Sequence, residues 1–349
     1  MTPLRFKPLV KRARWGGTRL GSVLGKPTGT ETDYAESWEF SDHGADQSVI
    51  VGGPWDGITM QDFTRHYNAA LFGRHAGLKQ FPLLVKFLDA SDRLSVQVHP
   101  NDIQARILHP GENGKTEAWV IVDAAPGASV YAGLKQHVDQ FRLEQHLQND
   151  TIEECLHRVE VQPGDCIFIP AGTVHAIGEG ILLAEVQQSS DLTYRLSDWG
   201  RMGADGKPRQ LHIEESLACI DWDRGPVNPT RSKSVVSLHE RSGQFYNTDE
   251  IAACEYFVLH RHSGTVPFPL HEQGCFHALL VLDGEGDLVC GFERIELRRG
   301  SSVLIPAVCS GDIELVPNGS LTVLDAFLPA KTAWKPEDQA VEVEEVVLV

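Results

Sequence analysis

The sequence predicts a mainly β protein built from two related β-barrels of the jelly-roll type, with a few short helices. Two observations support this fold class. Short apolar runs alternate with turns roughly every 8 to 12 residues, which is typical of all-β sandwiches and barrels. Residues 163–175 also have an echo at residues 299–309, where Gly, Pro and Ala recur at one offset. Each copy predicts a turn, an apolar strand and a Pro-Ala corner.

Composition sets the outer limits. With 349 residues and 42% hydrophobic content, the chain can bury a large core in one large or two ordinary domains. It has no run of about 18 apolar residues and no basic-then-apolar start, so we expect no membrane span, no signal peptide and a cytoplasmic location. A net charge of -17 argues against nucleic acid as a partner. A small anionic substrate is compatible with this charge if Lys and Arg gather in one pocket.

The seven cysteines are an odd number, widely spread and without a CxxC pair. This pattern argues against a disulfide framework and against a zinc ribbon. We therefore expect buried thiols.

The first part of the chain alternates loops with strands. Arg14–Gly17 predicts a loop and not a dinucleotide fingerprint, because no strand precedes it and no βαβ unit follows. Residues 58–71 predict a short helix, capped by Thr59 with Asp62 at the third helical position. The expected strands are residues 35–40, 83–89, 94–99 and 116–122.

Two short helices at residues 136–148 and 150–157 form a predicted helical insertion, and strands return at 166–169 and 181–186. A polar connection then carries a helix at 213–219, and short strands follow between residues 234 and 327. The predicted divisions are a first, metal-binding catalytic domain (1–200), a linker (201–233), a second β domain (234–330) and an acidic tail (331–349).

Four side chains in the first domain could bind a metal. Gln97 and His99 share one face of a predicted strand, because successive side chains of a strand alternate. Glu117 opens the next strand, and His175 follows the Pro-Ala corner. An amide, a carboxylate and two imidazoles suit zinc or another divalent first-row ion. The second corner has Cys309 where the first has a histidine, so we expect one metal per chain.

Other charged residues are candidates for substrate contact. Lys115 lies two positions before Glu117, and an exposed loop lysine is the plain alternative. Asp191 and Arg195 are placed near the barrel mouth, where an arginine could pair with a phosphate or stabilise an oxyanion; a surface ion pair is the alternative. For Lys86, inside an apolar strand, we expect structural pairing with Asp89, Glu36 or Glu39 rather than catalysis.

Several segments, taken together and in order, resemble the type I mannose-6-phosphate isomerase family. They are Ala35–Glu39, Leu94–Pro100, Gly114–Trp119, Gly164–Ala176 and Asp191–Arg195. The resemblance runs from about residue 5 to 201 and continues weakly into the second unit. It implies two cupin-like barrels and a zinc-dependent aldose-ketose isomerase that acts on a sugar phosphate. It also implies Gln97, His99, Glu117 and His175 as zinc ligands, and Lys115, Asp191 and Arg195 at the substrate.

The chain departs from longer members of that family by short connections between His99 and Glu117 and between Glu117 and His175. We therefore expect it to lack a separate helical domain. The catalytic base stays open. Three alternatives to this isomerase also stay open at this point: a sugar-phosphate-binding protein without activity, an isomerase of a different sugar phosphate, and a metal-dependent oxygenase.

Overall fold

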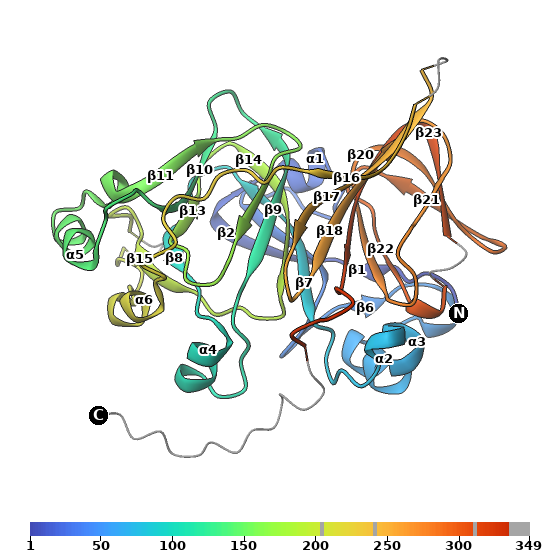
Figure 1. Cartoon of the computed structure of the whole chain (residues 1–349), viewed down its shortest axis with the longest axis horizontal. Helices are drawn as coiled ribbons and strands as arrows, with labels where there is room; N and C mark the ends of the chain where they lie inside the picture. Colours follow the sequence, from blue (N-terminus) through green and yellow to red (C-terminus); the bar gives the residue numbers. More distant parts are fainter. Residues whose placement is uncertain (203–205, 240–242, 310–312, 335–349) are drawn as a thin grey trace.

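Antiparallel sheets dominate the regular secondary structure of the computed structural model, and Figure 1 shows two β-rich units side by side. The structure describes residues 1–202, 206–239, 243–309 and 313–334. Within these ranges the mainly β fold class with short helices is confirmed. None of the helices in the described ranges is long and apolar enough to cross a membrane.

The first unit contains two sheets that pack against each other through a shared apolar cluster including Trp119, Val130 and Leu183. In spatial order, the six-stranded sheet consists of β12 (Cys166–Ile169), β9 (Glu117–Ala124), β14 (Ile181–Gln188), β7 (Leu83–Ala90), β3 (Tyr34–Phe40) and β2 (Leu9–Gly17). The five-stranded sheet consists of β11 (Leu156–Glu160), β10 (Ser129–Leu134), β13 (His175–Ile177), β8 (Val96–Val98) and β15 (Tyr194–Ser197).

The second unit is a single eight-stranded sheet, whose long strands stand on the right in Figure 1. Its main path is β16 (Lys233–His239), β17 (Phe245–Ala253), β18 (Val258–Gly264), β23 (Ile313–Phe327), β20 (His277–Cys290) and β21 (Glu293–Arg298). Two shorter strands join it at the side: β19 (Phe268–Pro269) pairs with β23, and β22 (Ser302–Ile305) pairs with β20. Two small ribbons complete the strands: β1 (Phe6–Lys7) with β6 (Val49–Ile50), and β4 (Asp42–His43) with β5 (Asp46–Gln47).

Closed barrels are not found among the described residues, because each of the sheets ends in an edge strand that pairs on one side only. The two β-units nevertheless share the turn, strand and proline corner that the sequence repeat predicts. In both copies of the repeat a glycine with positive φ, Gly164 at 94° and Gly300 at 84°, precedes a four-residue strand that ends at a proline. A glycine favours this left-handed turn because it has no Cβ. Ser310 and Gly311, which follow the second corner, lie outside the described residues.

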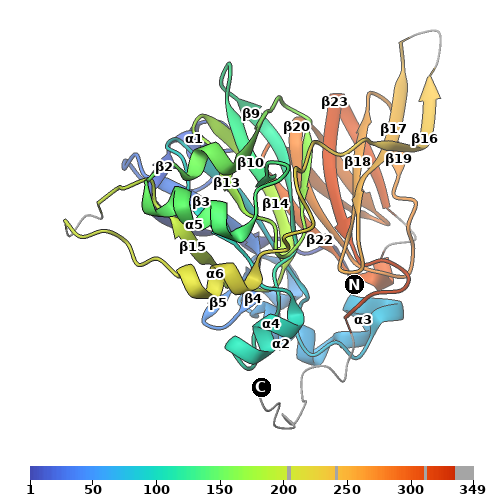
Figure 2. The ribbon, with the colours of Figure 1, turned by 60° about the vertical axis from the view of Figure 1, so that its left-hand side comes forward.

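Short helices flank the sheets: in the turned view of Figure 2, α5 and α6 lie beside the first unit and α4 lies below the strands. The α-helices are α1 (Arg19–Ser22), α2 (Met60–His66), α3 (Asn68–Phe72), α4 (Asp102–Leu108), α5 (Gln140–Gln148) and α6 (Ile213–Cys219). The 3-10 turns are η1 (Gly53–Trp55), η2 (Gly73–His75), η3 (Ile152–Cys155) and η4 (Ala307–Cys309).

The helix predictions were correct in part. The Thr59 side chain caps α2 by accepting a hydrogen bond from the Asp62 backbone, as predicted, but the helix breaks at Tyr67 before α3 begins. The predicted second helix of the insertion, residues 150–157, was correct in part: it is the short 3-10 helix η3, which ends at Cys155, and the chain enters strand β11 at Leu156. The helix α4 is not among the predicted helices.

Both units share one apolar core. Phe276 of the second unit packs against Phe72 and Phe81 of the first, with ring centroids 6.0 and 4.9 Å apart. Leu4, near the amino terminus, pairs with Leu304 of β22. Burial of such side chains stabilises the joint between the units. The predicted boundaries at residues 200, 233 and 330 stay a prediction, and most of the predicted acidic tail lies outside the described residues.

Candidate metal centre and its surroundings

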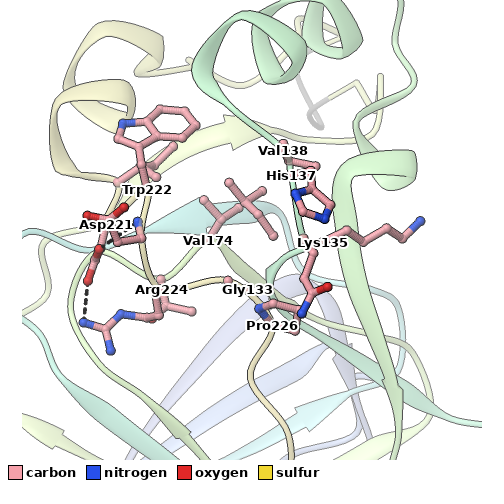
Figure 3. A pocket seen from close by; sticks show the side chains of 16 residues that line it. Gly133, Lys135, His137, Val138, Val174, Asp221, Trp222, Arg224 and Pro226 are labelled. Atoms are coloured by element: carbon pink, nitrogen blue, oxygen red, sulfur yellow. Dashed lines mark hydrogen bonds and ion pairs between the residues drawn. The ribbon is translucent and has the colours of Figure 1, made fainter.

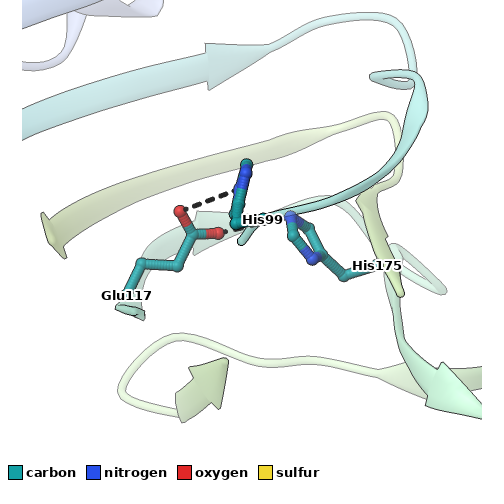
Figure 4. A group of neighbouring side chains, drawn as sticks. All are labelled: His99, Glu117 and His175. Carbon is teal, nitrogen blue, oxygen red and sulfur yellow. Dashed lines mark ion pairs between the residues drawn. The ribbon is translucent and has the colours of Figure 1, made fainter. Parts of the chain in front are cut away.

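Three buried side chains from the two sheets of the first unit meet at one point. His99 follows the end of β8 and His175 begins β13, while Glu117 begins β9 of the opposite sheet. Each of the three is at most 1% exposed. The Nε2 atoms of His99 and His175 lie 3.4 Å from Oε2 and Oε1 of Glu117, respectively. Figure 4 shows both imidazoles facing this carboxylate.

Backbone carbonyls fix the orientation of the two imidazoles. His99 Nδ1 lies 2.9 Å from the Leu192 carbonyl oxygen, and His175 Nδ1 lies 2.8 Å from the Thr173 carbonyl oxygen. A carbonyl only accepts, so Nδ1 of each ring must carry the proton and donate it. The lone pair of each Nε2 then points into the site, which is the tautomer that a metal ligand needs.

Charge states in the site also fit a cation. Burial, together with the charge of the neighbouring Lys115, lowers the pKa of His99 to about 3. Burial likewise lowers the pKa of His175. For Glu117 burial acts to raise the pKa, but Lys115 and His99 outweigh it and hold the pKa well below its usual range. The cluster therefore offers two neutral imidazoles and one carboxylate anion.

The site contains buried polar atoms that lack a hydrogen-bond partner among the described residues. They are His99 Nε2 and both carboxylate oxygens of Glu117. Burying such atoms without a partner is costly, so an arrangement of this kind calls for a ligand. Tetrahedral coordination at the usual metal–ligand distance would separate ligand atoms by roughly 3.3 Å, close to the 3.4 Å found here. These residues fit a divalent cation.

Gln97 and Lys115 complete the surroundings. The Gln97 amide nitrogen lies 3.1 Å from His175 Nε2, and the two residues are paired across β8 and β13. Rotation of the amide by half a turn would present its oxygen to the same point. Lys115 is 4% exposed, and its Nζ lies 3.3 Å from Glu117 Oε2. Lys115 lies in the loop before β9 rather than in the strand. Because its side chain is buried there, the alternative of an exposed loop lysine was wrong.

The sequence and the fold of this chain are similar to those of known proteins. Residues 4–126 match the model of the phosphomannose isomerase type I catalytic domain. The chain is 37% identical over 308 residues to mannose-6-phosphate isomerase ManA of Bacillus subtilis, covering 87% of this chain and 93% of that relative. This chain belongs to the mannose-6-phosphate isomerase family.

Other members agree with this assignment. A mannose-6-phosphate isomerase of Streptococcus mutans is 32% identical over 323 residues, covering 91% of this chain and 98% of that relative. The crystal structure of the mannose 6-phosphate isomerase from Bacillus subtilis superposes with a TM-score of 0.83 at 28% identity, covering 93% and 99% of the two chains. The similarity therefore extends through both β-units of this family member.

The two remaining site candidates, Arg195 and Asp191, have different surroundings. Arg195 is paired with Gln97 across β15 and β8, but its guanidinium donates to the Gln210 carbonyl at 2.9 Å. Burial lowers the pKa of Arg195, and Arg209 lowers it further. Asp191 is exposed, and its charge acts on Lys86. The contacts of the described residues do not include an ion pair between Asp191 and Arg195.

A buried ion network lies beside the metal cluster and was only partly foreseen. Lys86 Nζ lies 3.1 Å from Glu185 Oε1 and 3.4 Å from Glu36 Oε2. The prediction of structural pairing for Lys86 named Glu36 correctly but missed Glu185, and Asp89 pairs with Arg19 instead. Burial acts to lower the pKa of Lys86, but Glu185 and Glu36 outweigh it and raise the pKa. Lys86 is therefore a cation.

Glu185 was missed because its partner is set by register. Glu185 lies opposite Lys86 in β7 and opposite Trp119 in β9, a pairing that periodicity along one strand does not reveal. Burial raises the pKa of Glu185, and the charge of Glu117 raises it further, while Lys86 acts to lower it. A carboxyl group whose pKa is raised next to a candidate metal site is a candidate for proton transfer.

A separate cavity of about 350 Å³ lies behind the five-stranded sheet. Residues 133–138 form one wall and residues 220–226 the other, with Val174 between them (Figure 3). Its charged lining includes Asp221 and Arg224, which pair at 2.7 Å. None of the predicted site residues lines this cavity. The cavity is therefore separate from the cluster of His99, Glu117 and His175.

Proposed function

We propose that this chain is a zinc-dependent enzyme that interconverts mannose 6-phosphate and fructose 6-phosphate. One observation carries the proposal: His99 Nε2 and both Glu117 oxygens are buried without a hydrogen-bond partner among the described residues. In a member of the mannose-6-phosphate isomerase family, this arrangement is best explained by a catalytic cation.

The proposed zinc ligands are Gln97, His99, Glu117 and His175, with one ion per chain. Two imidazoles, a carboxylate and an amide oxygen match the nitrogen and oxygen donors that zinc accepts. Lys115 sets the charge of Glu117 and excludes a proton from it. When bound, the ion would act as a Lewis acid that polarises and orients the sugar oxygens.

The reaction relocates two protons, one from C2 to C1 and one from O2 to O1. The base removes the proton from C2 of mannose 6-phosphate, the C2–H electron pair forms the C1=C2 bond, and the C1=O π pair moves to O1, which takes up a proton to give the cis-enediol. Loss of the O2 proton then re-forms a carbonyl at C2, and the C1=C2 pair takes a proton from the protonated base at C1, which gives the ketose without any oxidant. A base near its working pH serves best, which makes Glu185 a candidate beside the open alternatives.

Charged groups around the cluster would handle the substrate. Lys115, which points at Glu117, is proposed to contact the sugar phosphate. Arg195 is proposed to stabilise negative charge that develops on oxygen; its pairing with Gln97 places both on one face of the sheet. Asp191, exposed in the loop between β14 and β15, is proposed to orient Arg195 or the sugar.

Finer features of the chain also remain proposals. We propose that the two β-units are cupin-like jelly rolls and that the first is catalytic, while the second lacks a metal. All seven cysteines lie in the described residues, and none of them is in a disulfide there. Disulfides are rare in reducing compartments, and we propose the cytoplasm as the location.

A coupled assay tests the proposed function. Purified protein loaded with zinc should convert mannose 6-phosphate to fructose 6-phosphate, a chelator should abolish turnover, and added zinc should restore it. A panel of other sugar phosphates separates the proposed substrate from a different one. Zinc-replete protein that binds mannose 6-phosphate without turning it over would instead be a binding protein.

A further inference from the structure

Asp102, the first residue of α4, connects three parts of the molecule. Its Oδ1 accepts hydrogen bonds from the Gly114 backbone at 2.8 Å and from Gln188 Nε2 at 3.0 Å. Its Oδ2 accepts a hydrogen bond from the Tyr256 hydroxyl at 2.6 Å. The carboxylate therefore joins the loop before β9, the end of β14 and the second unit.

The loop held by Asp102 carries two of the proposed site residues. Lys115 lies inside it, and its backbone N–H donates to the Pro100 carbonyl at 3.0 Å. The Thr116 backbone N–H donates to Gln188 Oε1 at 2.9 Å, and Glu117 follows directly. Gly114 is pressed against α4: a Cβ there would lie 2.5 Å from the Asp102 backbone nitrogen. The positions of Lys115 and Glu117 thus depend on where Asp102 lies.

Tyr256 is the contribution of the second unit to this arrangement. It belongs to the connection between β17 and β18, 154 positions after Asp102 in the sequence. Trp334 holds it in place, because its ring packs edge-on at 5.7 Å and its Nε1 donates to the Tyr256 carbonyl at 3.3 Å. In Figure 1, α4 lies below β8 and β9, at the end where β9 begins. The Tyr256 hydroxyl reaches this helix from the second unit.

We propose that Tyr256 is a positioning residue for the isomerase site and acts through Asp102 on the loop that carries Lys115 and Glu117. The inference rests on the proposed function and gives the second unit a role in it. That unit supplies a rigid anchor for the loop. Small displacements of groups that must align with a substrate lower turnover far more than they lower stability.

Removal of one hydroxyl tests the proposal. In zinc-loaded Tyr256→Phe we expect kcat to fall about tenfold, with KM changed less than about twofold and the unfolding temperature lowered by only a few degrees. Asp102→Asn should also lower kcat, and the double variant should add little, because both act through one contact. Tyr246→Phe is the matched control: its ring packs on Phe268 in the same unit, and it should behave as the unaltered protein.

Cobalt-loaded protein gives a readout that does not need turnover. Because Glu117 would be a ligand, Tyr256→Phe should change the visible absorption spectrum of the bound cobalt, and Tyr246→Phe should not. Unchanged kcat in Tyr256→Phe, an equal loss in Tyr246→Phe, or additive losses in the double variant would overturn the inference. If the unaltered protein shows no turnover, the proposed function fails and the cobalt spectrum decides: a shift supports the positioning role, and identical spectra overturn it.

Discussion

Each β-unit contains a buried cluster of two histidines and one carboxylate. The two clusters differ in whether their ring nitrogens and carboxylate oxygens have hydrogen-bond partners. In the first unit, Nε2 of His99 and both oxygens of Glu117 lack hydrogen-bond partners among the described residues. In the second unit, His277 Nδ1 lies 2.9 Å from Asp325 Oδ2 and its Nε2 lies 2.9 Å from the Glu272 carbonyl. Both nitrogens of that ring face acceptors.

Proton accounting assigns the second cluster a structural role. His277 can satisfy two acceptors only as a doubly protonated cation, and Asp325 raises its pKa to about 10 against the opposing effect of burial. His262 donates from Nε2 towards Asp325 at 3.3 Å, and its Nδ1 accepts from Thr248 at 2.9 Å. The polar atoms of this cluster thus form hydrogen bonds with one another and with neighbouring protein groups.

The comparison shows that burial of histidines beside a carboxylate does not identify a metal site. What distinguishes the first cluster is the direction of its lone pairs, which is fixed by carbonyls behind each imidazole. Lone pairs that lack hydrogen-bond partners and converge on one point fit a cation. The tests that follow aim at this difference between the clusters.

The largest expected effect follows removal of the shared carboxylate of the first cluster. Glu117→Ala should lower turnover by more than about a thousandfold and release the metal, because the only anionic ligand is lost. Metal analysis together with the coupled assay measures both. His262→Asn, in the second cluster, is the matched control and should keep one metal per chain. Loss of the metal from His262→Asn but not from Glu117→Ala would reverse the assignment of the clusters.

Removal of the carboxylate charge from the second cluster should affect stability instead. Asp325→Asn leaves the His277 cation buried without its counterion, and breaking such a pair costs about 3–5 kcal/mol. The free energy of unfolding from urea titration measures this loss. Retention of bound metal and of residual turnover in the folded fraction is expected. A stable Asp325→Asn protein that has lost its metal would show that this cluster also serves a cation.

The same pair predicts how stability depends on pH. His277 titrates near 6.5 when unfolded and at about 10 when folded, so its contribution is fully present below pH 6.5 and is lost as the pH rises towards 10. The loss between pH 6.5 and 8.5 should be roughly 2–3 kcal/mol. Urea titrations across this range in the unaltered protein and in His277→Gln isolate the effect. An equal pH slope in both proteins would contradict it.

Local patterns predicted much of the fold and most of the first cluster. The strand at residues 302–305, the helix at 213–219 and the Thr59 cap follow from periodicity, turn chemistry and capping, which are properties of short segments. Gln97 and His99 were placed on one face by the alternation of a strand. His175 was found because the repeated Pro-Ala corner marked its position.

The features that sequence reasoning missed depend on contacts between distant segments. Glu185 meets Lys86 through sheet register, and Asp102 meets Tyr256 across 154 positions of chain. Whether the sheets close into barrels likewise depends on pairing at their edges, which periodicity does not encode. The histidines of the second cluster come from neighbouring parts of one sheet, and nothing in their sequence spacing distinguishes them from metal ligands.

Gln97 gives the smallest and most discriminating test of the first cluster. Gln97→Leu keeps the size of the side chain but removes its oxygen, so affinity for zinc should fall by about 10- to 100-fold, an effect in the range seen when one supporting group is lost. Competition with a chelator dye measures the affinity. Gln97→Glu is the matched control, because it keeps an oxygen donor and should bind at least as well as the unaltered protein. Equal affinity in all three proteins would mean that the Gln97 side chain is not a ligand and that the cation has three protein ligands.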